Sequence, residues 1–170
     1  MKARIYTHSF KTRFGFFKLE ATERGFYSLQ FGKGLNGGKS ARTTPHLKKL
    51  GRKLSSYLKG KKVNFDKVAI DWSGYSGFKR RVLENLRRIP RGKTGSYQFL
   101  AARAGRPKAT RAVGQILHLN RLPIILPCHR ILPKRGGLGG FAKGSEWKKR
   151  LLKLEGAPVD TRGEVKRGLV

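Results

Sequence analysis

The stretch Ser96–Leu119, with the sequence SYQFLAARAGRPKATRAVGQILHL, decides the fold of the second half of the chain. Ser96 can cap a short helix that runs through Ala104, because a serine side chain accepts hydrogen bonds from the free N–H groups of a first helical turn. Gly105 can end that helix, and helical spacing resumes from Ala109 to Leu119. Two helices joined by a tight turn that contains glycine predict a helix-turn-helix.

The second of these helices has two unlike faces. An apolar stripe predicts its buried side: Val113, Ile116 and Leu117. The opposite side is polar and basic, with residues three, four and seven positions apart: Arg111, Gly114, Gln115 and His118.

Small residues surround the arginine on this helix. Ala109, Ala112 and Gly114 favour a helix that lies close against a shallow minor groove rather than one that reads the major groove with long side chains. We therefore predict that Arg111 enters a base stack. An ordinary packed helix with a solvated arginine is the alternative.

The rest of the chain predicts an α+β fold in two lobes. Alternating apolar and polar residues at 14–19 and 25–31 predict a small antiparallel sheet. Leucines at helical spacing in 46–58 predict a helix that covers one face of the sheet. We place an N-terminal α/β lobe at 1–72, a mostly helical DNA-binding domain at 73–157 and a flexible tail at 158–170.

The charge predicts a polyanionic partner. The chain has 40 Lys and Arg against 9 Asp and Glu, a formal net charge of +31. The interval between Glu84 and Glu146 contains 13 Lys and Arg and no acid. Nucleic acid is the favoured partner, although ribosomal and membrane-surface proteins share such a composition. Lacking any long apolar run or signal-peptide pattern, the chain is expected to be cytoplasmic, nucleoid-associated in a prokaryote, and not bound to a membrane.

The chemical centre is expected around Cys128, the only cysteine of the chain. It ends an apolar, strand-like run framed by Pro123 and Pro127, so its thiol should be partly buried and need activation. In an extended chain His129 points to the other side, so it reaches the sulfur only through a bend or a bridging water. A disulfide within the chain is excluded, and the four histidines have no zinc-finger spacing.

Glu155 is the expected partner of His129. It lies three and four residues after Leu152 and Leu151 on the last predicted helix, hence on the apolar face, and near a C-terminus whose dipole disfavours an anion. A carboxylate in such a place predicts a specific partner. A frayed, exposed carboxylate is the alternative.

The sequence Pro127–Ile131, PCHRI, resembles the active-site signature of the O6-alkylguanine-DNA alkyltransferases. The resemblance extends over the second lobe with matching spacing, whereas the first lobe is similar only in layout. The matching blocks are Ile89-Pro90, Gly92-Lys93, Ser96-Tyr97, Leu100-Ala101, Ala104-Gly105, Pro107-Lys108-Ala109, Arg111-Ala112-Val113-Gly114, Asn120, Pro123, Leu138-Gly139-Gly140-Phe141, Lys148, Leu151-Leu152 and Glu155-Gly156.

The resemblance implies direct DNA repair. Cys128 would take the alkyl group of a flipped O6-alkylguanine irreversibly, once per molecule and without a cofactor, and O4-alkylthymine stays open as a further substrate. His129 and Glu155 would form a water-bridged relay, and Tyr97 would donate to N3 of the leaving guanine. Arg111 would fill the gap left by the flipped base.

Further roles follow from the same resemblance. Asn120 would be the hinge between the recognition helix and the active-site loop, in a left-handed conformation that asparagine tolerates. The remaining DNA contacts would come from Ala109, Ala112, Gly114, Gln115 and Arg130. The substrate pocket would be lined by Pro123, Leu138, Gly139, Phe141 and Ala142.

Two departures from the family pattern bear on these expectations. Phe141 stands where the family commonly has a tyrosine, so a hydroxyl contact to the substrate is absent, and Lys143 replaces a glycine near the pocket mouth. His8 and His46 have no thiolate companions, so no structural metal is expected. We expect a monomer that binds double-stranded DNA.

Three other functions compete with repair. A lesion-binding protein of the alkyltransferase-like type would lack the acceptor cysteine, which is present here as Cys128. A basic architectural or regulatory DNA-binding protein explains the charge but not the conjunction of Tyr97, Cys128-His129 and Glu155. A thiol peptidase takes its cysteine and histidine from distant parts of the chain, which the adjacent pair here does not match.

Overall fold

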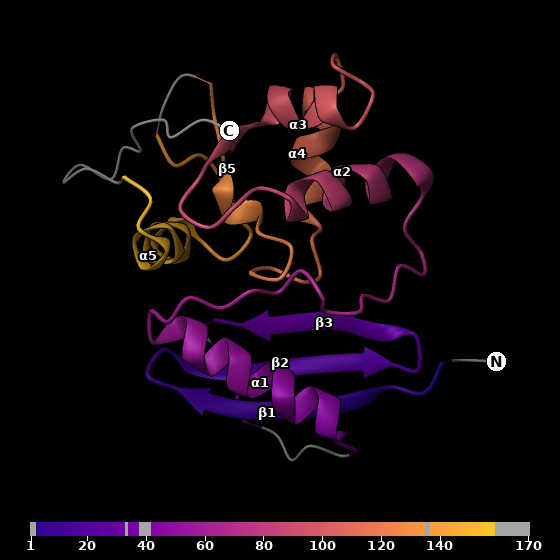
Figure 1. Cartoon of the computed structure of the whole chain (residues 1–170), viewed down its shortest axis with the longest axis vertical. Helices are drawn as coiled ribbons and strands as arrows, with labels where there is room; N and C mark the ends of the chain where they lie inside the picture. The colour runs from indigo at the N-terminus through magenta and orange to yellow at the C-terminus, as the bar shows by residue number, and fades with distance from the viewer. Residues whose placement is uncertain (1–2, 33, 38–41, 135–136, 159–170) are drawn as a thin grey trace. The chain divides into compact units, whose positions relative to one another are not determined.

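The computed structural model describes residues 3–32, 34–37, 42–134 and 137–158. The chain forms two compact units, Met1–Ser73 and Gly74–Val170. Among the residues described, an antiparallel sheet and one helix make up the first unit, and helices dominate the second (Figure 1), which confirms the predicted α+β class. The tail predicted at 158–170 lies, apart from Pro158, outside the described residues.

The first unit is built on a three-stranded antiparallel sheet in the order β1-β2-β3. Its strands are β1 (Tyr6–Thr12), β2 (Gly15–Thr22) and β3 (Gly25–Phe31). The register pairs Phe17 of β2 with Phe10 on one side and Phe31 on the other, and the three rings stack. This aromatic row lies in the core of the unit, where Phe17 is completely buried.

Helix α1 (Pro45–Leu58) covers the sheet as the spacing of its leucines predicts. It begins where Thr44 accepts a hydrogen bond from the Leu47 amide at 3.3 Å, and Pro45 fits the first turn because its missing N–H would have no partner there. Leu47, Leu50 and Leu54 are buried, and each contributes about 1.5–3 kcal/mol through removal from water.

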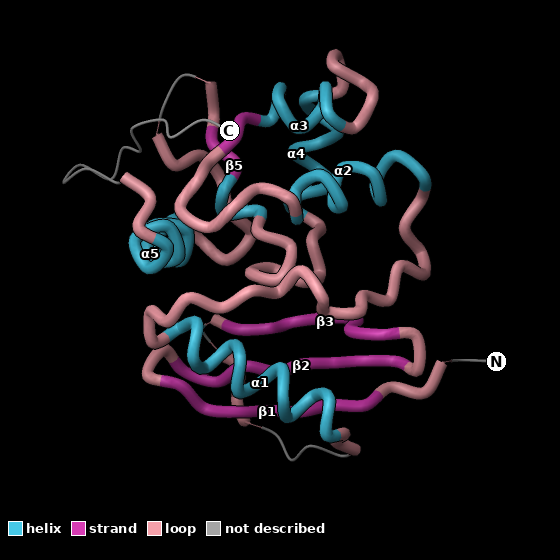
Figure 2. Tube along the Cα trace, viewed as in Figure 1, coloured by secondary structure: helices cyan, strands magenta, loops and turns pink. Residues whose placement is uncertain are grey.

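The described part of the second unit contains four α-helices, one 3-10 helix and a short parallel strand pair, and Figure 2 shows how they follow one another. In chain order the elements are α2 (Gly77–Arg87), β4 (Gly95–Ser96), α3 (Tyr97–Arg103), α4 (Thr110–His118), η1 (Cys128–Arg130), β5 (Ile131–Leu132) and α5 (Ser145–Glu155).

The predicted pair of helices is present as α3 and α4, which pack against each other. Ser96 caps α3 by accepting from the Phe99 amide at 3.0 Å, and Gly105 takes a φ of +82° in the turn that follows. Val113 and Leu117 of α4 are buried, whereas Arg111 and Gln115 are exposed. The polar face that the sequence predicted therefore lies at the surface of the unit.

The expectation of a strand leading into Cys128 is wrong. Residues 123–126 form a tight turn, closed by a 2.8 Å hydrogen bond from the Leu126 amide to the Leu122 carbonyl. Pro123 and Pro127 have no N–H to give to a sheet, which disfavours a strand through this segment. Cys128 instead begins η1, so the chain bends at the thiol.

This turn contains Ile124 at a φ of +76°, the one non-glycine residue with positive φ among those described. A β-branched residue in that region is strained by about 1–3 kcal/mol. The predicted left-handed backbone at Asn120 is therefore wrong: the unusual conformation lies four residues later. Complete burial of Leu122 and Leu126 is consistent with a rigid turn.

Candidate active site

Cys128 is the first residue of η1, just after the buried turn at 123–126, and it is 7% exposed. Asn120 Nδ2 donates to Cys128 Sγ at 3.2 Å and to the Leu126 carbonyl at 2.8 Å. The Oδ1 atom of the same side chain accepts from the Leu122 amide at 3.0 Å. One amide thus ties the active-site turn together and aims an N–H at the sulfur, which favours the thiolate.

The environment of the thiol favours its neutral form at rest. Burial raises the pKa of the Cys128 thiol above its ordinary value, and the Asn120 hydrogen bond and the Lys148 charge oppose this rise only in part. A protonated thiol is a weak nucleophile. The site therefore needs a base that removes the proton when a substrate is in place.

His129, the next residue along the chain, is the candidate for that base. Its Nε2 lies 3.0 Å from Glu155 Oε1, and both side chains are completely buried. Burial lowers the pKa of His129, which Glu155 offsets in part, so the ring is neutral at neutral pH. With Glu155 accepting at Nε2, the proton of the neutral ring lies there and Nδ1 carries the free lone pair. Nδ1 is buried and makes no hydrogen bond to the described residues.

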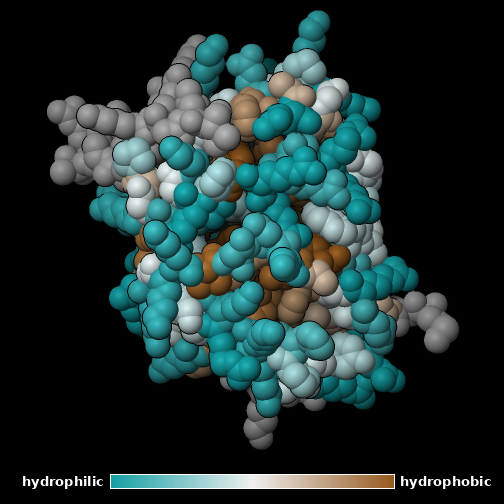
Figure 3. All heavy atoms as spheres, viewed as in Figure 1, coloured by the Kyte–Doolittle hydropathy of each residue, from teal (hydrophilic) through white to brown (hydrophobic). Residues whose placement is uncertain are grey.

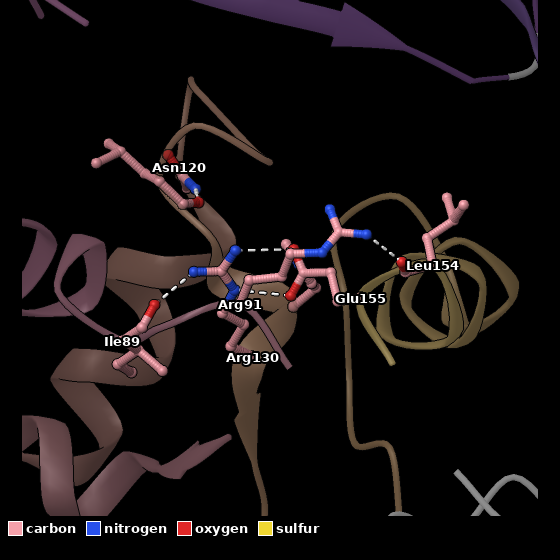
Figure 4. A network of polar contacts seen from close by, with 8 residues as sticks. Ile89, Arg91, Asn120, Arg130, Leu154 and Glu155 are labelled. Atoms are coloured by element: carbon pink, nitrogen blue, oxygen red, sulfur yellow. Dashed lines mark hydrogen bonds and ion pairs between the residues drawn. The ribbon is translucent and has the colours of Figure 1, made fainter. Parts of the chain in front are cut away.

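Arg130 completes the partner set of Glu155. Its Nε donates to Oε2 and its Nη2 to Oε1, each at 2.8 Å, while Nη1 donates to the Ile89 carbonyl (Figure 4). Burial raises the pKa of Glu155, but His129 and Arg130 lower it more strongly. The pKa of this carboxyl therefore lies well below its usual range, and the carboxyl is ionised at neutral pH. Glu155 thus has the specific partners that its place on the apolar face predicts.

Lys148 is a site residue that the sequence interpretation did not assign. Its Nζ donates to the Ile131 carbonyl at 2.7 Å and to the Gly140 carbonyl at 3.5 Å. Burial lowers the pKa of Lys148 to about 8, a fall that the neighbouring Cys128 opposes. The signal was available, because Lys148 shares the apolar face of α5 with Leu151, Leu152 and Glu155 at spacings of three, four and seven.

The family comparisons cover both units. The DNA binding domain of 6-O-methylguanine DNA methyltransferase matches residues 77–157, and the ribonuclease-like domain of the same protein matches residues 5–72. The methylated-DNA–protein-cysteine methyltransferase of Methanopyrus kandleri is 44% identical over 126 residues, which are 74% of this chain and 91% of that protein. The chain belongs to the 6-O-methylguanine DNA methyltransferase family.

The chain is also similar to other members of the family, at lower identity. The methyltransferase of Methanothermobacter thermautotrophicus is 39% identical over 114 residues, which are 67% of this chain and 64% of that protein. Mycobacterium tuberculosis OGT, solved in complex with DNA, is 31% identical at a TM-score of 0.75, covering 88% of this chain and 92% of its own. The M. tuberculosis similarity spans both units of the fold.

The structure brings the predicted catalytic residues together within the second unit. Cys128 and His129 are adjacent in η1, and Glu155 reaches His129 from the end of α5. Tyr97 is the first residue of α3, and burial together with the nearby Cys128 raises the pKa of its hydroxyl. The Tyr97 hydroxyl of this chain therefore stays protonated close to the Cys128 thiol.

The residues predicted to contact DNA fall into two groups in the structure: those on α4 lie at the surface, whereas Arg130 bonds to groups inside the protein. Those on α4 lie on or beside its outer face, where Gly114 leaves room beside Tyr97: a Cβ there would lie 3.9 Å from the ring. Arg130 has a different role from the DNA contact expected of it, because all three of its nitrogens bond Glu155 or Ile89 inside the protein. Its guanidinium fixes the carboxylate that holds His129.

The expected pocket residues have unequal exposure. Pro123 is buried, Leu138 and Phe141 are half-buried, and Gly139 and Ala142 are exposed. Gly139 has a φ of +64°, and a Cβ on it would meet Pro133 at 2.6 Å, so the loop passes close to that ring. The glycine thus permits a fold of the loop that a larger residue would block.

No metal centre is indicated in the described part of the chain. Groups of three or more His, Cys, Asp or Glu side chains that could hold an ion do not occur among the residues with a described placement. His8 stacks on Phe10 within the first unit, at a centroid distance of 5.7 Å.

Lys148 gives the reaction rate a testable pH profile. The rate should be highest near neutral pH, where His129 is neutral and can accept the thiol proton while Lys148 Nζ is still charged, and it should fall above about pH 8 as Lys148 Nζ becomes neutral and stops stabilising the thiolate. Lys148→Met should remove the falling limb and slow the reaction at pH 7. Single-turnover rates from pH 6 to 10 check this, and an alkaline limb that persists in Lys148→Met would assign it to another group.

Proposed function

We propose that this chain repairs DNA directly by moving the alkyl group of O6-alkylguanine onto Cys128 Sγ, once per molecule. The observation that carries the proposal is the buried cysteine with an amide donor at 3.2 Å and a neutral histidine, held by a carboxylate at 3.0 Å, next to it. The relatives are named for the same reaction. The alkyl donor is the DNA itself, so the proposed reaction needs no cofactor.

The proposed chemistry is a direct displacement. The thiol proton passes to His129 Nδ1, either directly or through a water, and Glu155 stabilises the imidazolium that forms. An S–C bond forms as the C–O6 bond breaks, and the electron pair of that bond leaves with guanine. Tyr97 donates a hydrogen bond or proton to N3 of the leaving base, which neutralises the charge that develops there.

The proposed stoichiometry is one lesion per protein molecule. Transfer leaves a thioether that none of the described active-site groups could cleave. With excess duplex containing O6-methylguanine, lesion loss should stop when it equals the number of protein molecules. Continued loss beyond that number would show turnover and overturn the proposal. Lesion binding without loss would favour a lesion-flagging protein.

The proposed partner is double-stranded DNA. A monomer of the protein would bind the minor groove of the DNA with helix α4. The small residues Ala109, Ala112 and Gly114 would permit close approach, and Arg111, whose side chain is exposed, would fill the space of the flipped base. None of the described helices is both long and apolar enough to cross a membrane. We propose the cytoplasm, with the DNA, as the place of action.

Arg111→Ala should slow repair of duplex DNA about tenfold or more while leaving attack on free O6-methylguanine base unchanged, because holding a base out of the stack is worth a few kcal/mol. Single-turnover rates on both substrates check this. Arg150→Ala, which removes an exposed arginine from α5, is the matched control and should alter neither rate. An equal loss on both substrates would contradict the role of Arg111 in base flipping.

A further inference from the structure

The outer face of α1 carries a cluster of positive charge in the first unit. Lys49, Arg52 and Lys53 are exposed and, at spacings of three and four, share one side of the helix. They line a shallow, open groove whose other wall is formed by Lys62 and Asn64 of the loop that follows. Hydrophilic side chains gather over α1 in Figure 3. We call these four cations the α1 cluster.

The stretch of sequence that carries the cluster contains no acid. Residues 24–65 contain 11 Lys and Arg and no Asp or Glu. Asp66, the first acid after this interval, accepts a 2.8 Å hydrogen bond from the Asn64 side chain. On α2, by contrast, Arg80 lies 2.8 Å from Glu84 in an i,i+4 ion pair. Helix α1 itself contains no acid, and in the groove Lys53 Nζ donates to a neutral group, the Asn64 carbonyl, at 3.5 Å.

Repulsion between the positive side chains of α1 makes the helix less stable when no anion is bound. Lys49 and Lys53 form a like-charged i,i+4 pair, as do Lys48 and Arg52, and like charges at this spacing destabilise a helix. The positive field reaches the sheet below, where burial and then Lys48 and Arg52 lower the pKa of His8. A bound polyanion would relieve this repulsion. The opposite face of the helix is fully used in the core by Leu47, Leu50 and Leu54.

We propose that the α1 cluster is a second DNA-binding site, which holds the phosphate backbone of duplex DNA without reading its sequence. The groove is lined by these four cations with Ser56, Val63 and Asn64, so it offers charge and hydrogen-bond donors to phosphate oxygens but no aromatic ring on which bases could stack, which favours backbone contact. The choice of DNA among polyanions rests on the proposed function. The site itself is independent of the alkyl-transfer chemistry.

The test is the salt dependence of binding to undamaged duplex DNA. Each phosphate contact contributes about −0.9 to the slope of log K against log salt. The variant Lys49→Gln/Arg52→Gln/Lys53→Gln should therefore have a slope less steep by about 2–3 than the unsubstituted protein. The control Lys11→Gln/Arg24→Gln/Lys67→Gln removes the same charge elsewhere in the first unit and should leave the slope nearly unchanged. Lys49→Arg/Lys53→Arg should keep the full slope.

The outcomes separate this proposal from the repair function. Equal slopes in the cluster variant and the control, with both folded as judged by thermal unfolding, would overturn the second site. Loss of binding to phosphatidylserine vesicles with an unchanged DNA slope would also overturn it, in favour of a membrane surface. Transfer from free O6-methylguanine base should be the same in all these proteins. If none of these proteins, the unsubstituted one included, took the methyl group from the free base, the repair chemistry would be refuted. The salt slopes would still test the α1 cluster.

Discussion

Glu155→Ala should lower the free energy of unfolding by about 3–5 kcal/mol, the cost of breaking a buried ion pair from one side. The substitution leaves the Arg130 guanidinium without its two carboxylate bonds, and His129 Nε2 without an acceptor. A further part of the loss is the packing of a side chain that is completely buried. Equilibrium unfolding in denaturant at pH 7 measures the change.

The chain provides a matched control in the exposed pair of α2. Glu84→Ala removes a carboxylate that lies 2.8 Å from Arg80 but is 39% exposed, so the change should stay within about 0.5 kcal/mol. Similar losses in the two variants would show that the buried network adds nothing beyond a surface ion pair. Glu155→Gln, which keeps the shape, should fall between the two.

The same network determines how stability depends on pH. The folded-state pKa of Glu155 is lowered, so its contribution is present above the ordinary value of 4.5 and is lost as pH falls below it. The lowered pKa of His129 acts in the same direction, because the unfolded state takes up the proton first as pH falls below 6.5. Both groups therefore make the protein less stable in acid.

Asn120→Ala should slow alkyl transfer about 100- to 1000-fold, the usual cost of losing one donor aimed at a charge in a reacting site. The substitution removes the N–H that lies 3.2 Å from Cys128 Sγ, so the pKa of the thiol should rise further above its ordinary value. It also removes the two bonds to Leu122 and Leu126 that close the turn. Single-turnover transfer from the free base isolates this effect from DNA binding.

Two comparisons distinguish stabilisation of the thiolate from simple support of the turn. Asn85→Ala is the control, since that amide bonds the Arg81 and Arg103 carbonyls and not the thiol. Asn120→Asp keeps the acceptor for Leu122 but puts a negative charge beside the sulfur, so it should react no faster than Asn120→Ala. If the rate of thiol alkylation by iodoacetamide has the same pH profile in Asn120→Ala as in the unsubstituted protein, the electrostatic role is wrong.

The sequence predicts the regular parts of this fold well because local rules govern them. The cap at Ser96, the glycine turn at Gly105 and the leucine spacing of α1 each specify their element through contacts within a few residues. Strand β1 was not singled out, since its side chains are mostly half-buried and its alternation is weak. Glu155 was found because a carboxylate on an apolar helix face needs a partner.

The details of the site depend on contacts that no periodicity encodes. The turn at Ile124, the Asn120 bond to the sulfur and the inward position of Arg130 each depend on how α4, η1 and α5 meet. The apolar run between the two prolines resembles a strand by its composition. The prolines lack N–H groups, however, and this favours the turn that forms. Lys148 has no assigned role in the sequence analysis, because a lysine usually keeps its ammonium in water, whereas this one is completely buried.

The intact mass of the protein after reaction with duplex DNA that carries one O6-methylguanine tests the central claim most directly. After nuclease removes the DNA, the account predicts a gain of one methylene per protein molecule, located on the peptide that contains Cys128 and absent from Cys128→Ser. A gain that persists in Cys128→Ser, or restored guanine in the DNA with no gain on the protein, would contradict transfer to this thiol.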